Sequence, residues 1–266
     1  MLGRHSFQVH PETRFGSRHG RRTVSAQHTP RQNHLLAALP LEDYERLLPL
    51  LEPVPLPAGW TIHGANSLEK HLYFVTAGLV SRYYEMEDGT SVEFADAGSE
   101  GAIGIASFLG GESTPSLAVV LSAGYAYRLA EDLVNQEFKY GRPLARLLLR
   151  YVQALITQTG QIAVCNRHHS LDQQLCRWLL SSLDRLSSNE LVMTQELIAH
   201  MMGVRREGVT EAVGRLEKAG LIHHNRGHIT LIDRPRLEAR VCECYGVVKR
   251  EYERLLPEDR QAELAC

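Results

Sequence analysis

Three consecutive charged residues, Arg205, Arg206 and Glu207, open a segment whose side chains suit contact with the edges of nucleic-acid bases. An arginine guanidinium can donate two parallel hydrogen bonds to a guanine, and a glutamate can accept one from a cytosine amino group. Thr210 and Arg215 follow on the same segment and offer donors for phosphate oxygens. On an arbitrary helix these residues would only form a solvated surface, so the elements that carry them decide the interpretation.

The stretch that carries them, 194–219 (TQELIAHMMGVRREGVTEAVGRLEKA), predicts two short helices joined by a tight turn. Thr194 can cap the first helix, and Gln195 lies in its first turn. Gly203 follows the small Ala199 by four residues, which allows the helices to approach closely and the turn to adopt a positive φ. Both segments repeat apolar residues at helical spacing, namely Leu197, Ile198, Met201, Met202, Val204, Val209, Ala212, Val213 and Leu216.

Two β-prone runs follow the second helix, at 221–224 and 228–232, with Asn225, Arg226 and Gly227 between them as a hairpin turn. A helix-turn-helix followed directly by a hairpin is a winged helix, which binds DNA through the second helix and the hairpin. The predicted DNA-binding residues are Thr194, Gln195, Arg205, Arg206, Glu207, Thr210, Arg215 and Arg226.

The pattern differs in the first half of the chain. Short helical segments at 33–36 and 41–48 precede a stretch, 56–127, of short β-prone runs separated by glycines, such as 72–75 and 79–84. Many short strands with frequent turns predict a sandwich or barrel.

A long helix is predicted from Arg142 to Cys165, between the two halves. Its apolar positions step by 4, 3, 4, 3, 4 and 3, which is typical of the seam of a coiled coil. The expected dimerisation residues are Leu144, Leu148, Tyr151, Leu155, Gln158 and Ile162, and Cys165 continues the seam. In the alternative, the helix packs on the β-rich domain of its own chain, for which Leu147, Leu149 and Ala154 offer apolar surface.

This combination of a β-rich domain, a seam helix and a winged helix, over roughly 33–233, resembles the family of cyclic AMP receptor protein and fumarate-nitrate reduction regulators (the Crp/Fnr family). The resemblance implies an α+β fold, with an N-terminal cyclic-nucleotide-binding-like β-roll, a long dimerisation helix and a C-terminal winged helix-turn-helix. It implies a bacterial, homodimeric transcription regulator that reads a palindromic promoter site on double-stranded DNA and has RNA polymerase as a partner.

On this basis we divide the chain into five parts. They are a disordered basic arm (1–31), a β-roll sensor domain (32–140), a dimerisation helix (141–166), a winged helix-turn-helix domain (167–236) and a C-terminal helix (237–266). The arm holds six arginines against one acid, Glu12, and either contacts DNA phosphates without sequence preference or is an inert extension.

Three ligands of the family are not expected here. The cyclic-AMP-binding members place a Gly-Glu pair and a nearby arginine at the nucleotide, whereas this chain reads Gly101-Ala102 and has no Arg, Lys or His between Arg82 and Arg128. A buried phosphate without a cation would be costly. The iron–sulfur members use cysteines largely ahead of the β-roll, and this chain has none before Cys165. Haem would need His63 or His71 as a ligand, although single histidines on such strands are usually structural.

The five cysteines, Cys165, Cys176, Cys242, Cys244 and Cys266, predict reduced thiols in the cytoplasm, because an odd number confined to the second half does not suit a disulfide framework. A single helix is expected over 237–256. On one helix, Cys242 and Cys244 would point to different faces, so no metal site is expected. The adjacent pairs His168-His169 and His223-His224 are expected to face solvent or phosphate.

The composition sets the remaining expectations. An apolar fraction of 44% and a charged fraction of 23% are typical of a globular domain without a membrane segment, and no catalytic motif is apparent, so an enzyme is not expected. The net charge of −2 means that a local basic face must attract DNA. Two alternative modes of control stay open. One is response to a non-nucleotide metabolite, and the other is redox sensing through Cys165 or Cys176.

Overall fold

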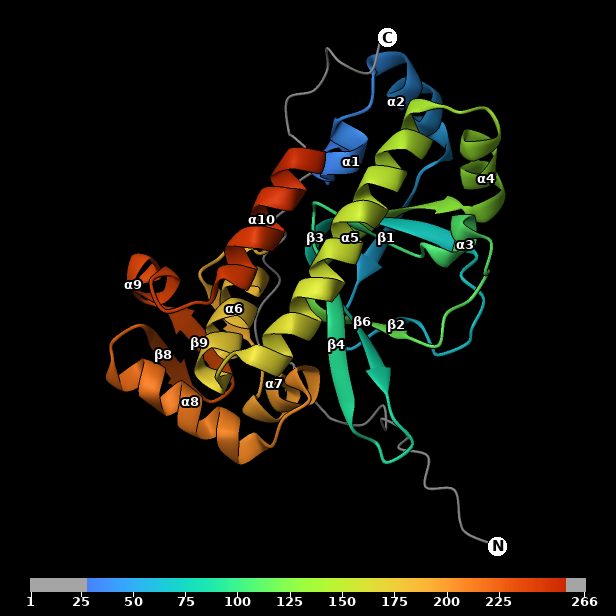
Figure 1. Cartoon of the computed structure of the whole chain (residues 1–266). Coiled ribbons are helices and arrows are strands. Elements are labelled where there is room, and N and C mark those ends of the chain that lie inside the picture. The colour runs from blue at the N-terminus through green and yellow to red at the C-terminus, as the bar shows by residue number, and fades with distance from the viewer. Residues whose placement is uncertain (1–27, 257–266) are drawn as a thin grey trace, which may run out of the picture.

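The computed structural model describes residues 28–256 and has a β-rich half, a long helix and a mostly helical half (Figure 1). The elements up to the long helix are η1 (Pro30–Gln32), α1 (His34–Ala37), α2 (Leu41–Leu47), η2 (Leu48–Leu50), β1 (Glu52–Leu56), β2 (Thr61–His63), β3 (His71–Glu85), β4 (Ser91–Ala97), β5 (Ala102–Ile103), α3 (Ala106–Leu109), β6 (Leu117–Ala130) and α4 (Glu131–Lys139). From the long helix onward they are α5 (Pro143–His168), α6 (Leu171–Asp184), β7 (Glu190–Val192), α7 (Gln195–Met202), α8 (Arg206–Lys218), β8 (Ile222–Asn225), β9 (His228–Leu231), α9 (Arg234–Glu238) and α10 (Glu243–Leu255).

The β-rich half is one antiparallel six-stranded sheet in the order β1-β6-β3-β4, with β2 on β6 and β5 on β3. Its two longest strands, β3 and β6, pair along most of their length, with register shifts that bend them around an apolar interior. The predicted runs 72–75 and 79–84 are therefore parts of the single strand β3. The expected α+β fold and β-roll are confirmed.

Asn33 fixes the start of the chain to the β-roll. Its buried side chain caps α1 by accepting from the N–H groups of Leu35 and Leu36, and donates to the carbonyl groups of Val75 (2.8 Å) and Gly101 (2.9 Å). The predicted disordered arm extended too far. His28 stacks on Tyr125, and Arg31 lies over the ring of Tyr44, so residues 28–31 are ordered. Residues 1–27 of the arm lie outside the described residues.

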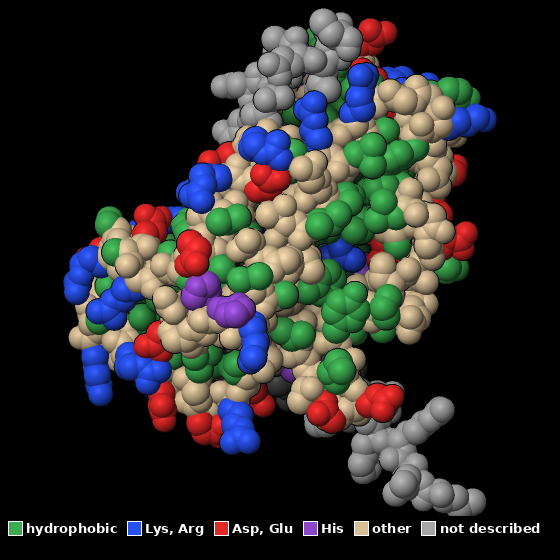
Figure 2. Space-filling model, viewed as in Figure 1, with side chains coloured by type: hydrophobic (Ala, Val, Ile, Leu, Met, Phe, Trp, Pro, Cys, Tyr) green, Lys and Arg blue, Asp and Glu red, His purple; other side chains and the backbone are tan. Residues whose placement is uncertain are grey.

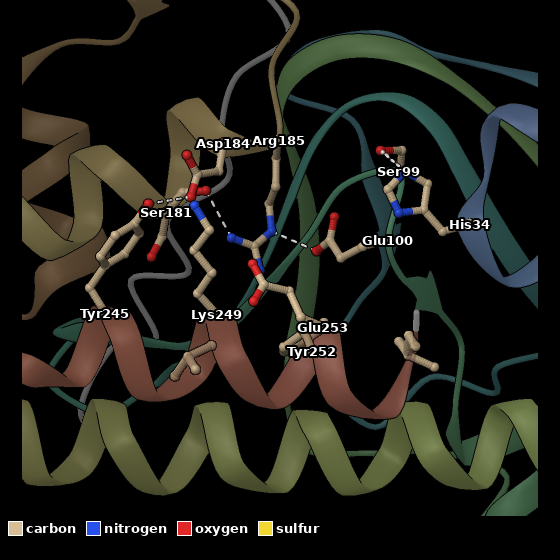
Figure 3. A pocket seen from close by; sticks show the side chains of 12 residues that line it. His34, Ser99, Glu100, Ser181, Asp184, Arg185, Tyr245, Lys249, Tyr252 and Glu253 are labelled. Carbon is tan, nitrogen blue, oxygen red and sulfur yellow. Dashed lines mark hydrogen bonds and ion pairs between the residues drawn. The ribbon is translucent and has the colours of Figure 1, made fainter. Parts of the chain in front are cut away.

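The long helix α5 crosses the β-roll, and α10 packs beside it (Figures 1 and 3). The residues predicted to form the dimer seam face the interior of their own chain, so this prediction is wrong. All of them are buried within one chain: Leu144, Leu148, Tyr151, Leu155, Gln158 and Ile162. Tyr151 donates to the carbonyl of Ala102 (2.9 Å), and Gln158 accepts from the hydroxyl of Tyr252 (2.9 Å). The seam therefore contacts the β-roll and α10, as the alternative interpretation held.

Close packing against α5 also explains a glycine of the β-roll. A Cβ atom at Gly101 would lie 2.8 Å from the Tyr151 hydroxyl, so that no larger residue fits while Tyr151 bonds to Ala102. Glycine at this position serves the contact between sheet and helix.

The helix predicted over 237–256 is broken. The chain forms α9, leaves the helical conformation at 239–242, and starts α10 at Glu243 with Cys242 as the extended N-cap residue (φ −72°, ψ 162°). Tyr252 and Leu255 of α10 join the core formed by α1, α2, α5 and the β-roll. Because Cys242 is not helical, the argument that placed Cys242 and Cys244 on different helix faces does not apply.

One apolar core connects the two halves. Leu79 and Leu121 of the β-roll lie in the same cluster as Trp178 of α6, Met201 of α7 and Val213 of α8. The helical half is therefore packed on the β-roll and not joined to it by α5 alone. No helix in residues 28–256 is long and apolar enough to span a membrane.

Candidate nucleic-acid interface

The helix-turn-helix forms as predicted. The Thr194 hydroxyl caps α7 by accepting from the N–H of Leu197 (3.2 Å), and Gly203 ends α7 with φ +65°. Arg205 is the N-cap residue of α8, although its side chain makes no capping bond. Val209, Ala212, Val213 and Leu216 of α8 are buried, which turns the opposite face outward.

The outward face carries the predicted base-reading residues. Arg205, Arg206, Glu207 and Thr210 are exposed at the start of α8, where the N-terminal end of the helix dipole also favours phosphate. Figure 2 shows basic and acidic side chains interleaved along α8, consistent with the net charge of −2. Within residues 28–256, the first turn of α8 thus presents donors and an acceptor at the exposed surface.

Two of the predicted residues are linked to one another. The Thr210 hydroxyl donates to the side-chain carbonyl of Gln195 (2.7 Å), which joins α7 to α8 on the exposed surface. This contact leaves the Gln195 amide nitrogen pointing away from Thr210 and available as a donor.

Arg215 has a partner that the sequence did not indicate. Its guanidinium binds Asp172 at the start of α6 through Nε–Oδ2 (2.9 Å) and Nη2–Oδ1 (2.6 Å). The pKa of Arg215 is raised, first by this hydrogen bond. Arg215 therefore holds α8 against α6 in this structure, and it is not a free phosphate donor as expected.

The wing is a three-stranded sheet in the order β7-β9-β8, and β7 is a strand that the sequence analysis missed. The turn between β8 and β9 has Arg226 at φ +46° and Gly227 at φ +84°, with Arg226 exposed at its tip. His223 lies 3.2 Å from Glu217, and His228 lies 2.8 Å from Glu190, so these rings contact carboxylates on the exposed wing.

Strand β4 of the β-roll supports α7. The Ser91 hydroxyl donates to the carbonyl of His200 (2.7 Å), and the His200 ring meets the ring of Tyr83 edge-on at 5.6 Å. A Cβ atom on Gly203 would lie 3.1 Å from the carbonyl oxygen of Ser91 and 3.2 Å from Cβ of Val92. The close approach at Gly203 is therefore to β4, rather than to the neighbouring helix as expected.

A buried polar network lies beside this support. Glu93 of β4 accepts from the Ser81 hydroxyl (2.6 Å) and from the indole N–H of Trp178 (3.1 Å). Asp96 accepts from the Gln158 amide and lies 3.3 Å from the Arg185 guanidinium. Burial raises the pKa of Glu93 to about 8, and the nearby Asp96 adds to the rise. The network joins β4 to α5, to α6 and to Arg185, the C-cap residue of α6.

A cavity of about 620 Å³ with a mixed polar and apolar lining opens next to Arg185, between α6, α10 and the β4–β5 turn. Figure 3 shows Arg185 with Glu100 on one side and with Lys249, Tyr252 and Glu253 of α10 below it. The Arg185 guanidinium donates to Glu100 at 2.6 Å. The cavity therefore lies where the β-roll, α6 and α10 meet.

The two histidines considered as haem ligands, His63 and His71, both belong to the β-roll. Buried His63 lies 3.2 Å from Glu69, and burial lowers the pKa of His63. Glu69 in turn accepts from the N–H of Ala106 (2.8 Å). Arg82 is also buried, over the ring of Phe94 (5.1 Å). His71 is half-buried at the start of β3, and burial lowers its pKa. The expectations about cyclic AMP, an iron–sulfur cluster and haem remain predictions.

The cysteines differ from expectation. Cys165, His169, Cys242 and Cys244 come together, with one sulfur or nitrogen atom from each lying within 4.8 Å of the others. The geometric argument against a metal site therefore fails, because the break before α10 brings Cys242 and Cys244 to the end of α5. His169, expected in solvent, is half-buried there, whereas His168 is exposed.

Of the two thiols considered as redox sensors, Cys165 belongs to this group and Cys176 does not. Cys176 is buried in α6, and burial raises its pKa to about 11. Cys266 lies outside the described residues. Reactive cysteines are usually accessible and have lowered pKa values, so the surroundings of Cys176 favour the unreactive thiol.

Comparison with known proteins identifies the domain and the fold. Residues 173–240 match the family model of the Crp-like helix-turn-helix domain. The structure is similar to FixK2 from Bradyrhizobium japonicum (TM-score 0.63, 17% identity), covering 72% of this chain and 98% of that one. It is also similar to a transcriptional regulator of the Crp/Fnr family from Eubacterium rectale (TM-score 0.63, 20% identity, 80% and 98% covered).

A CRP-family regulator from Thermus thermophilus is a further structural match (TM-score 0.59, 20% identity, 70% of this chain and 95% of that one). No curated protein sequence matches the chain. The first two of these matches extend over 98% of the matched chains, and the domain model covers the helix-turn-helix part of this chain. Residues 173–240 are therefore a Crp-like helix-turn-helix domain, and the overall fold is that of solved regulators of the Crp/Fnr family.

Proposed function

We propose that the protein is a homodimeric, sequence-specific transcription regulator that reads a palindromic promoter site with two copies of α8. The observation that carries the proposal is the exposed first turn of α8, where Arg205, Arg206 and Glu207 stand on a capped helix-turn-helix. Side chains at this end of a recognition helix reach base edges in the major groove. The neighbouring residues Thr194, Gln195 and Arg226 contact the sugar-phosphate backbone of the DNA.

The dimer contact of this proposal is a second apolar stripe on α5. Leu149, Val152, Ile156, Thr159 and Ala163 step by 3, 4, 3 and 4, and they lie about a quarter of a turn around the helix from the buried seam. Leu149 is 53% and Ile156 is 66% exposed, which is costly for large apolar side chains without a partner. Figure 2 shows hydrophobic side chains along the course of α5.

A parallel pair of α5 helices would bury this stripe and relate two reading heads by a two-fold axis. The symmetry of the pair would then match a palindrome with half-sites about 34–36 Å apart. The regulator acts in the bacterial cytoplasm, where its partners are promoter DNA and RNA polymerase.

Selection of DNA from a random library, followed by fluorescence anisotropy with the selected site, tests the proposal. We expect recovery of an inverted repeat and binding at least about a thousandfold tighter than to unrelated DNA at the same salt concentration. Binding that is equally tight to every duplex would contradict sequence-specific regulation.

A second candidate function, control by a metabolite, is supported by the cavity beside Arg185. It is large enough for a small ligand and is lined by charged and aromatic side chains from three elements. A ligand there would contact the β-roll through Glu100 and the helical half through Arg185 and α10. A thermal-shift screen of polar metabolites tests this candidate. We expect ligands that raise the Tm of the wild type but not of Lys249→Glu, whose exposed side chain lines the cavity.

A further inference from the structure

The group formed by Cys165, His169, Cys242 and Cys244 contains none of the proposed DNA-contacting residues and is not explained by the proposed function. Cys165 lies in the last turn of α5, and His169, the C-cap residue, donates its backbone N–H to the carbonyl of Cys165 (3.0 Å). Cys242 and Cys244 flank the first residue of α10. The four side chains therefore connect the last turn of α5 to the first turn of α10.

The separations within the group match a single tetrahedral ion. The Cys165 and Cys242 sulfurs are 3.6 Å apart, and the Cys244 sulfur is 3.6 Å from Nδ1 of His169. With Zn–S bonds of about 2.3 Å and Zn–N bonds of about 2.0 Å, neighbouring ligand atoms of a tetrahedron lie about 3.5–3.8 Å apart. The ligands of an iron–sulfur cluster bind different irons and spread more widely than these atoms, which all lie within 4.8 Å of one another.

The surroundings of the four residues are those of metal ligands. His169 directs Nδ1 at the sulfur of Cys244, and its Nε2 lies 3.3 Å from a carboxylate oxygen of Glu243. Ligand histidines commonly donate their second ring N–H to a carboxylate in this way, which fixes the tautomer and the ring. The backbone of His169 is held as well, because its carbonyl accepts from the Gln174 amide (2.9 Å).

The charge around the group is also balanced for a divalent ion. Three thiolates and one neutral imidazole around such an ion would leave a net charge of −1. Buried Arg177 donates through Nε to the Cys165 sulfur at 3.3 Å and supplies the compensating positive charge.

Two simpler explanations account for less of the geometry. Buried cysteines can pack as small apolar residues, but an imidazole nitrogen aimed at their sulfurs is not needed for that. A disulfide between Cys165 and Cys242 requires a sulfur separation of about 2.05 Å. It would leave Cys244 and His169 without a role.

We propose that Cys165, His169, Cys242 and Cys244 bind one zinc-class divalent cation, which fastens the start of α10 to the end of α5. Thiolate and imidazole ligands in a tetrahedron select zinc among the common divalent ions, and four protein ligands indicate a structural ion without an open position. The ion holds α10 beside α5 and thereby the junction at which α6 leaves α5. The site does not depend on DNA binding.

Titration of the reduced, full-length protein with Co²⁺ after removal of bound metal by a chelator tests the site. We expect thiolate-to-cobalt charge-transfer absorption and tetrahedral ligand-field bands that saturate at one ion per chain and disappear when Zn²⁺ is added. Cys244→Ala removes one ligand, and we expect its affinity for Co²⁺ to fall by at least about tenfold.

Cys176→Ala is the matched control, because Cys176 and Cys244 are each 1% exposed and only Cys244 belongs to the group. This variant should bind one Co²⁺ with the spectrum of the wild type. His169→Gln is a second ligand variant, at a half-buried position, in case Cys244→Ala does not fold. It too should lose affinity.

Three results would overturn the proposal. The first is a folded, reduced wild type that gives no tetrahedral cobalt spectrum. The second is equal affinity in the ligand variants and in Cys176→Ala. The third is purification of the protein with iron and sulfide in place of a single ion.

Discussion

Arg206 shows how an assignment from residue type and helix position can be tested at one position. Its side chain is exposed in the first turn of α8. A guanidinium there can read a guanine or neutralise a phosphate, and these two roles have different signatures in binding measurements.

We predict that Arg206→Ala reduces discrimination at one base position by about 1–3 kcal/mol and has little effect at the others. Fluorescence anisotropy with the selected operator and its single-base variants measures this. Arg254→Ala, an exposed arginine on α10, serves as the control and should bind like the wild type. An equal loss on all sequences would assign Arg206 to phosphate alone.

Glu93 is a carboxyl group whose protonation depends on its burial. Its pKa rises from 4.5 to about 8, mainly through burial and then through Asp96, against the opposing effects of Ser81, Arg177 and Arg185. The folded protein therefore holds a proton that the unfolded chain releases above pH 4.5. The resulting stability is complete below pH 4.5 and is lost as the pH rises towards 8.

We predict that Glu93→Gln weakens the fall in stability between pH 5 and pH 8, at most about 1.4 kcal/mol per pH unit for one proton. The amide can donate to Ser81 and accept from Trp178 without titrating. Urea unfolding of both proteins across this range measures the difference. Identical pH profiles would mean that Glu93 is ionised in the folded protein.

The sequence predicted the roles of single residues correctly where their partners lie nearby in the chain. Thr194 caps α7 as its type and position indicated. The partner of Arg215 is Asp172, 43 residues away, and no local pattern could identify it. The cysteine group failed for the same reason, since its two halves are separated by more than 70 residues.

Among the elements, the contact of β4 with the helix-turn-helix depends on a glycine. Gly203 has φ +65° and leaves only 3.1 Å for a Cβ atom next to the Ser91 carbonyl oxygen. An added methyl group would be strained both by its backbone conformation and by this contact.

We predict that Gly203→Ala lowers the free energy of unfolding by about 1–3 kcal/mol. Gly214→Ala is the control, because a Cβ atom there meets nothing within 4 Å and the residue lies inside α8. It should raise the free energy by about 0.5–1 kcal/mol. Chemical unfolding measures the free energy of unfolding of both variants. An unchanged value for Gly203→Ala would show that β4 shifts at little cost to make room for the methyl group.

The long helix α5 has two apolar stripes, and the sequence analysis chose the one that is buried within the chain. We predict that Ile156→Glu converts the dimer into monomers, because the change places a charge at the centre of the exposed stripe. Thr157→Glu, next to it and off the stripe, should remain dimeric. Sedimentation velocity measures the mass, and a dimer that survives Ile156→Glu would place the interface elsewhere.

The sequence predicted helices and strands correctly where the spacing of apolar residues agrees with the positions of capping residues and glycines. The helix-turn-helix and its hairpin combine caps, glycines and helical spacing, and each was predicted close to its observed bounds. The break between α9 and α10 was not predictable in this way, because residues 239–242 (ARVC) contain no proline or glycine. Leu237 and Cys242, on the two sides of the break, are both buried.

For the whole molecule, the shared core has a consequence for the way in which the proposed dimer would read DNA. The cluster running from Leu79 through Trp178 to Val213 makes one body of β-roll and reading head in each subunit. If two such subunits pair along α5, the distance and the angle between their two recognition helices would be fixed.

Binding by a dimer of fixed geometry depends on the rotation between the two half-sites around the DNA axis as well as on their sequence. One base pair added between the half-sites turns the second half-site by about 34° and moves it by about 3.4 Å. We predict that this insertion weakens binding at least about tenfold although every contacted base is kept, and that anisotropy with the lengthened operator will detect the loss. Unchanged affinity would mean that the two heads swivel independently.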